Sequence, residues 1–155
     1  MIASDVRGGD WLAEVPGKNA IVVMEGISMY LKPEELKVVL QNLCSRFNNV
    51  HLLMDCYTTF AAKASKYKNP INDVGVTKVY GIDEPKEMEE DTGLAFVKEH
   101  SMTPENLVNE LQGMERRVFR KLYSGKIAQK MYRLYEFSEK YSGERSYFYC
   151  RRIKL

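Results

Sequence analysis

Apolar positions in the first third of the chain form two short runs that each end at an acidic residue. The first run, Ala20–Met24, is followed by Glu25, and the second, Val50–Met54, is followed by Asp55. Short apolar runs that contain β-branched residues are typical of buried strands. The pattern therefore predicts the same device twice, a strand followed directly by an acid.

The segment between the two runs has the spacing of an amphipathic helix. Apolar residues recur at helical intervals through Pro33–Phe47. Pro33 suits the first helical position, and Glu34 and Glu35 suit the positive end of the helix dipole. A right-handed helical crossover between two parallel strands brings both acids to one edge of the sheet. We expect a ligand site at this edge.

The second half of the chain predicts further elements of one α/β domain. A short apolar run predicts a strand at Leu94–Val97, and Thr103-Pro104-Glu105 predicts the start of a helix. Apolar residues at helical spacing predict a last helix over Lys126–Tyr141. Alternation of side chains predicts a final strand at Ser146–Lys154.

Composition narrows the class of protein. The 155 residues suffice for one domain with a core, and no apolar run is long enough to span a bilayer. The N-terminus has no signal-peptide pattern. Three scattered cysteines, Cys44, Cys56 and Cys150, are typical of small core residues in a reducing compartment. We therefore expect a cytoplasmic protein.

Charge is unevenly distributed although the net charge is only +2. Residues 81–110 hold 2 Lys/Arg and 9 Asp/Glu, whereas residues 111–155 hold 12 Lys/Arg and 4 Asp/Glu. The two segments can neutralise each other across a surface, and we expect neither a nucleic-acid nor a membrane partner. The alternative is an RNA-binding module, for which the basic residues would have to share one face.

The candidate functional residues lie at the predicted strand ends. Glu25 and Asp55 could accept hydrogen bonds from a ligand, or could simply cap the next helix, and Asp5 lies at a possible third edge. Tyr30 and Tyr57 follow the two acids and could line a pocket or fill the core. No phosphate-binding glycine loop, metal-ligand spacing or nucleophile motif is present in the sequence.

Several runs together point to a known family. They are Glu25–Leu31, Pro33–Glu35 and Leu53–Tyr57, with Asp5–Arg7 and Trp11–Leu12 before them and Tyr80–Pro85, Gly93–Val97, Glu115–Arg116 and Tyr132–Tyr135 after them. Through these runs the chain resembles the leucine carboxyl methyltransferase family, whose bacterial branch includes the tetracenomycin-type polyketide O-methyltransferases. The resemblance covers essentially the whole chain.

The resemblance implies a partial Rossmann-like class I methyltransferase sheet, with strands three or four to seven, the last strand antiparallel, and helices on its faces. It implies S-adenosylmethionine as cofactor and methyl transfer to a carboxylate or hydroxyl of a small molecule. Asp5 and Val6 match the family positions that hold the adenine region, and Glu25 matches a glutamate of the cofactor site. Asp55 and Tyr57 match the edge where acceptor and cofactor meet.

The chain departs from the family in its first half. The family's glycine-rich loop, its acid after the second strand and its upstream basic residues are not in this sequence. We therefore expect residues 1–155 to form a single domain that corresponds to the C-terminal portion of the fold, and activity of the chain alone stays open. The alternative is a truncated, non-catalytic module that self-associates through the edge Ile21–Met24, and we expect a homo-oligomer.

Overall fold

A computed structural model describes residues 2–65, 78–122 and 130–140, and these form an open, mixed α/β sheet. The spatial order is β1-β2-β4-β3. The strands are β1 (Asn19–Met24), β2 (Asn49–Tyr57), β3 (Leu94–His100) and β4 (Tyr132–Glu139). β1 and β2 are parallel, while β4 runs antiparallel to both of its neighbours. The predicted α/β class is confirmed.

The crossover from β1 to β2 is the predicted helix. The short helix η3 (Ser28–Tyr30) leads into α1 (Pro33–Arg46). Pro33 occupies the first turn, where a backbone N–H would have no partner within the helix, so that the N–H that proline lacks costs the helix no hydrogen bond. The Glu35 carboxylate accepts the Lys32 amide at 2.9 Å and so closes the first turn. The helix therefore begins at the carboxyl edge of β1, which is where its sequence signals place it.

The core lies between α1 and one face of the sheet. Leu36, Val39, Leu40 and Leu43 of α1 are buried against alternate residues of the strands. On β2 these alternate residues are Val50, Leu52, Met54 and Cys56. Burial of a large aliphatic side chain contributes about 1.5–3 kcal/mol, so this layer supplies most of the apolar stabilisation.

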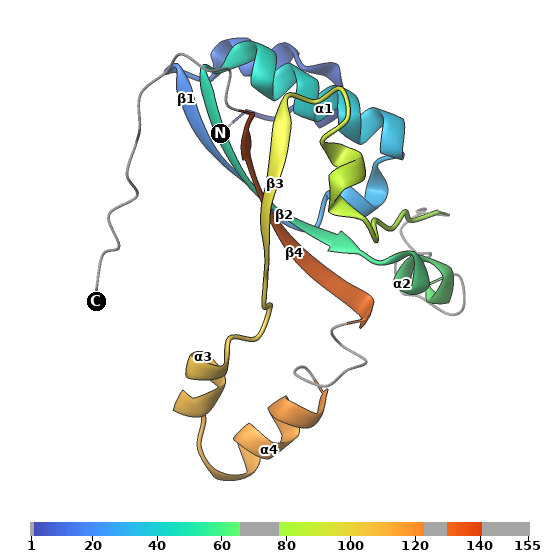
Figure 1. Cartoon of the computed structure of the whole chain (residues 1–155), viewed down its shortest axis with the longest axis vertical. Helices are drawn as coiled ribbons and strands as arrows, with labels where there is room; N and C mark the ends of the chain where they lie inside the picture. The colour runs from blue at the N-terminus through green and yellow to red at the C-terminus, as the bar shows by residue number, and fades with distance from the viewer. Residues whose placement is uncertain (1, 66–77, 123–129, 141–155) are drawn as a thin grey trace.

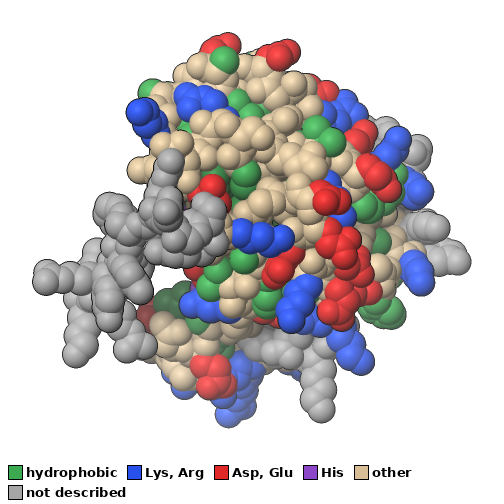
Figure 2. Space-filling model, turned by 45° about the horizontal axis from the view of Figure 1, so that its top comes forward, with side chains coloured by type: hydrophobic (Ala, Val, Ile, Leu, Met, Phe, Trp, Pro, Cys, Tyr) green, Lys and Arg blue, Asp and Glu red, His purple; other side chains and the backbone are tan. Residues whose placement is uncertain are grey.

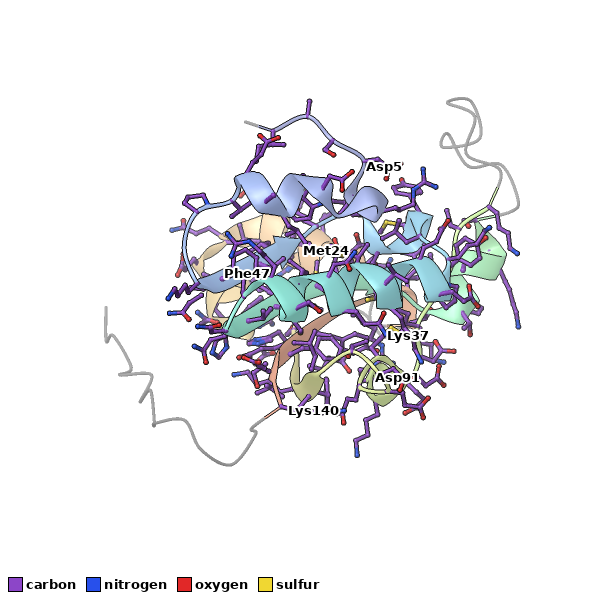
Figure 3. The ribbon with its side chains drawn as sticks, turned by 90° about the horizontal axis from the view of Figure 1, so that it is seen from above. Asp5, Met24, Lys37, Phe47, Asp91 and Lys140 are labelled. Atoms are coloured by element: carbon purple, nitrogen blue, oxygen red, sulfur yellow. The ribbon has the colours of Figure 1, made fainter. Side chains whose placement is uncertain are left out.

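The remaining elements flank α1 or stand apart from it. On one side of α1 lie η1 (Val6–Gly8) and η2 (Asp10–Glu14), and on the other lie η5 (Pro85–Met88) and the turn at Asp91 (Figure 3). The helix α2 (Thr59–Ala64) follows β2 directly. The helices α3 (Glu105–Glu110) and α4 (Gly113–Leu122) form a hairpin away from the sheet (Figure 1).

Helices were expected on both faces of the sheet, but the described helices that cover the sheet lie on one side of it (Figure 1). On the opposite face of β1, Ile21 and Val23 are exposed, whereas Ala20, Val22 and Met24 point toward the core. Ile21 pairs with His51 and Val23 with Leu53, so these four side chains share the opposite face.

The strand β4 shows that the predicted helix over Lys126–Tyr141 is wrong for its described part. Tyr135 and Phe137 are buried on the core face, and Glu136 between them points to the other face. Pairing with β2 on one side and β3 on the other fixes this segment as extended, although its apolar spacing also fits a helix. The predicted strand Ser146–Lys154 lies outside the described residues.

The segment before η5 is held tightly against the carboxyl edge. The Tyr80 amide donates to the Met29 carbonyl at 2.8 Å, and the Ile82 amide donates to the Tyr57 carbonyl at 2.7 Å. Between these two amides, a Cβ on Gly81 would lie 2.3 Å from the carbonyl group of Thr58. A glycine is therefore required for this close approach.

Acidic and basic side chains meet on the surface. Figure 2 shows Asp and Glu side chains gathered along one side of the face in view, with Lys and Arg side chains beside them. Lys37 of α1 pairs with Glu90 at 3.7 Å, and on β4 and β3 Arg133 pairs with Glu99 at 2.7 Å. Exposed pairs of this kind each contribute little to stability.

Candidate functional site

The candidate site is the carboxyl edge of β1 and β2, together with the start of β4. After Met24 the chain turns at Gly26, whose φ of 67° lies in the left-handed region that favours glycine. Because β1 and β2 are parallel, this turn lies beside the end of β2. The carboxyl ends of the two predicted strands, each with its acidic residue, therefore lie at one edge of the sheet, as the sequence pattern predicts.

Asp55 is the buried centre of this edge. It lies inside β2 instead of after it, and it is 3% exposed. Its two carboxylate oxygens accept the Gly26 amide at 3.0 and 2.9 Å, and one of them also accepts the Tyr132 hydroxyl at 2.7 Å. The Ser28 hydroxyl donates to the Asp55 carbonyl. Asp55 therefore ties the turn after β1 to β2 and β4.

Tyr132 and Tyr57 lie close to this carboxylate, and Tyr30 lies near Tyr57. The rings of Tyr57 and Tyr132 meet edge to face, with centroids 5.2 Å apart. Burial raises the pKa of Tyr57, with further contributions from nearby Tyr30 and Asp55. Burial also raises the pKa of Tyr132, and its hydrogen bond to Asp55 raises that pKa further. Both phenols therefore stay protonated at neutral pH, while Tyr30 is 42% exposed.

Glu25 occupies the outer rim of this edge. It follows the last residue of β1 and is exposed, next to the turn that Asp55 holds. An exposed carboxylate at the end of a parallel strand can accept hydrogen bonds from ligand hydroxyls. Its position directly after β1 fits the predicted ligand edge.

Asp5 and Val6 lie in the segment that packs beside the start of α1. The Asp5 carboxylate accepts the Arg7 amide at 3.0 Å and pairs with the Arg7 guanidinium at 2.6 Å. Hydrogen bonds from Arg7 lower the pKa of Asp5 to about 2. Arg7 also lies 3.6 Å from Glu35 in the first turn of α1, and Val6 packs against the core. Asp5 is therefore an exposed cap with a paired carboxylate.

The structure thus brings Asp55 and Tyr57 together, with Tyr30 near Tyr57. It places Glu25 on the rim and Asp5 and Val6 in a neighbouring segment. The residue that sequence reasoning missed is Tyr132, because its segment was expected to be helical. An alternating reading of the run that begins at Tyr132 would have placed it at a strand start, opposite the end of β2.

The site residues suit some ligands and not others. Among residues 2–65, 78–122 and 130–140, no group of three or more His, Cys, Asp or Glu side chains could hold a metal ion. Carboxylates and phenols suit hydroxyl and amino groups and a positive charge. The edge therefore suits a ligand that carries hydroxyl or amino groups, for which Glu25 is an exposed carboxylate. None of the described helices is long and apolar enough to cross a membrane.

Comparison with known proteins relates this chain distantly to methyltransferases. It is 27% identical over 118 residues to the tetracenomycin polyketide synthesis O-methyltransferase of Streptomyces glaucescens. The match covers 75% of this chain and 44% of that protein, so the chain spans less than half the length of this relative. No family model matches the chain.

Proposed function

We propose that this chain contributes to an S-adenosylmethionine-dependent O-methyltransferase, with the carboxyl edge of β1 and β2 as its share of the active site. The observation that carries the proposal is the match to an O-methyltransferase, which spans 118 residues. The buried carboxylate and tyrosines at the carboxyl edge support it, because open α/β sheets bind ligands there.

Glu25 is the residue proposed to hold the cofactor's ribose. Its carboxylate is exposed at the end of β1, next to a turn that Asp55 fixes through two hydrogen bonds. The cofactor, when bound, supplies a methyl group from its sulfonium. Asp5 and Val6 are proposed to border the adenine, with the Asp5 carboxylate held in place by Arg7. The glycine-rich cofactor loop is not in this sequence, so the proposal assigns this chain the ribose, adenine and acceptor sides of the site.

The protonation state of Tyr57 and Tyr132 bears on which methyl acceptor the site can use. An acceptor oxygen forms a bond to the methyl carbon as the bond from that carbon to sulfur breaks, and a hydroxyl acceptor must also lose its proton. Tyr57 and Tyr132 have raised pKa values and Asp55 already accepts three hydrogen bonds, so none of them is placed to take that proton. A small-molecule carboxylate is already ionised at neutral pH and needs only positioning. We therefore favour a carboxylate acceptor.

Titration with S-adenosylhomocysteine, observed through the backbone amide signals of the chain, tests the cofactor site. Because part of the family's cofactor site is missing from the sequence, we expect weak binding, with a Kd of about 1 mM or about −4 kcal/mol. Shifts should gather at Asp5, Val6 and Glu25–Gly26, and Glu25→Gln should weaken binding at least about threefold, or about 0.7 kcal/mol.

Glu34→Gln is the matched control, because Glu34 is another exposed glutamate near the carboxyl edge, in the first turn of α1. It should leave the affinity unchanged. Shifts confined to other surfaces, or equal affinities for the Glu25→Gln chain and the unmodified chain, would remove Glu25 from the site and count against the proposal.

A further inference from the structure

The direction of the exposed Glu25 side chain depends on the backbone of the turn that follows β1. Its carboxylate makes no hydrogen bond or ion pair with any described residue. The next residue, Gly26, has a φ of 67°, and a glycine can also adopt many other backbone conformations. The described side chain that holds this glycine in place is Asp55, whose carboxylate accepts the Gly26 amide.

The carboxylate of Asp55 is held in turn by Tyr132. Its Oδ2 atom accepts the Gly26 amide at 2.9 Å and the Tyr132 hydroxyl at 2.7 Å. Because both donors meet the same oxygen, a rotation of the carboxylate would disturb both hydrogen bonds together. Without the Tyr132 hydroxyl, the Gly26 amide would be the one described donor left to orient this carboxylate.

The backbone and the ring of Tyr132 are both fixed by the end of β2. Thr58 is 4% exposed, and its hydroxyl donates to the Lys130 carbonyl at 2.6 Å. The Thr58 amide donates to the Met131 carbonyl at 3.2 Å. The ring of Tyr132 meets the ring of Tyr57 edge to face, with centroids 5.2 Å apart. The hydroxyl is therefore presented in one direction before any ligand arrives.

We propose that Tyr132 is a positioning residue of the cofactor site. Through Asp55 and Gly26 it sets the direction in which the Glu25 carboxylate meets the ribose hydroxyls. The inference rests on the proposed function, which assigns Glu25 to the ribose. Tyr132 acts through the turn and not through a contact with the cofactor, because its hydroxyl proton is donated to Asp55. The strand β4 thereby takes part in the cofactor site.

Backbone amide NMR of the chain without ligand tests the first step. Tyr132→Phe keeps the ring and removes the hydroxyl, so the amide signals of Glu25 and Gly26 should shift. Tyr135→Phe is the matched control, because it removes another hydroxyl from β4, on the face that packs against α1. The Tyr135 hydroxyl contacts the Asp83 carbonyl at 3.4 Å, and its removal should leave both signals in place.

Titration with S-adenosylhomocysteine tests the second step, with all chains kept under conditions in which they are fully folded. Tyr132→Phe should weaken binding about threefold, and Tyr135→Phe should leave the affinity unchanged. In a chain that already carries Glu25→Gln, Tyr132→Phe should weaken binding less than about 1.5-fold, because the carboxylate that it positions is absent. A general loosening of the fold, or a direct contact of Tyr132 with the ligand, would weaken binding equally in both chains.

The outcomes separate this inference from the proposed function. Unmoved Glu25 and Gly26 signals, an unchanged affinity of the Tyr132→Phe chain, or an equal loss with and without Glu25→Gln overturns the positioning role. In each of these cases the proposed function stands if the unmodified chain binds and Glu25→Gln weakens that binding. A failure of the unmodified chain to bind S-adenosylhomocysteine overturns the proposed function and, with it, the role of Tyr132.

Discussion

Removal of the hydrogen bond between Asp55 and Tyr132 should reveal how strongly the edge of the site is held together. The bond is 2.7 Å long and joins residues 77 positions apart in the sequence. A hydrogen bond to a charged group contributes about 1.5–3 kcal/mol. Tyr132→Phe removes this bond and little else, and since Tyr132 is half-buried we expect a loss of about 1.5 kcal/mol in the free energy of unfolding.

Asp55→Asn acts on the same bond from the other side. Asparagine keeps the shape of the side chain but replaces one of the two oxygens that accept the Gly26 amide with an NH2 donor, and it carries no charge. We expect a loss of about 2–3 kcal/mol, because two donors then face each other at Gly26 and the hydrogen bond from Tyr132 is no longer made to a carboxylate. The double variant should lose about 3 kcal/mol, less than the sum, which gives a coupling of about 1 kcal/mol.

Urea unfolding at one fixed, low protein concentration measures all four chains. Each must show a single transition with an unchanged slope before the free energies are compared. Glu25→Gln serves as the control, because this exposed residue next to the same turn should change stability by less than about 0.5 kcal/mol. If the losses from Asp55→Asn and Tyr132→Phe add to within about 0.3 kcal/mol, the two residues are not coupled and the described network is refuted.

Three further outcomes follow from the local geometry. Gly81→Ala should cost about 3 kcal/mol in urea unfolding because its Cβ would overlap a backbone carbonyl, whereas Gly8→Ala, with no atom within 4 Å of its Cβ, should cost less than about 1 kcal/mol; similar costs would contradict the close approach. Carboxyl NMR should show Asp5 titrating near pH 2, and Arg7→Ala should raise that pKa toward its ordinary value. Because the pKa of Asp5 is lower in the folded state than in the unfolded state, its stabilisation is present above the unfolded pKa of about 3.9 and is lost as the pH falls through about 2. Burial raises the pKa of Cys56 to about 12, so its thiol should resist alkylation at pH 8 in peptide mapping, and rapid labelling of the native protein would contradict its burial. Because the folded pKa of this thiol is the higher one, its contribution to stability should decline as the pH rises above the unfolded pKa of about 8.5.

The unit β1-α1-β2 could be predicted from the sequence because its signals are local. Apolar runs, a proline with two following acids, and helical spacing each act within a few residues of the chain. The strand at Leu94 was predicted for the same reason. These predictions fix the edge at which Asp55 and the turn after Met24 meet.

β4 could not be predicted in this way, because its conformation depends on partners far away in the sequence. Tyr132 pairs with Tyr57, and Glu139 pairs with Leu94. The spacing of Tyr135 fits either a helix or a strand, and the pairing decides between them. The omission of Tyr132 from the predicted site follows from this error.

The predicted site residues also differ in how visible their partners are in the sequence. Asp55 could be placed at the ligand edge, but its burial and its three hydrogen bonds depend on Gly26 and Tyr132. Asp5 was considered as a ligand residue, and the structure pairs it with Arg7 two positions along the chain. Hydrophobic periodicity does not predict local charge pairs of this kind.

The position of β4 between β2 and β3 has a consequence for how the chain is made. The third strand to leave the ribosome, β3, has no neighbour within the described sheet until Tyr132–Glu139 has also emerged. Until then two strand edges, one on β2 and one on β3, stay open in the nascent chain, and long-range pairing of this kind forms slowly. A chain that stopped before Tyr132 would lose the strand between β2 and β3, so that β3 would have no strand to pair with in the described sheet.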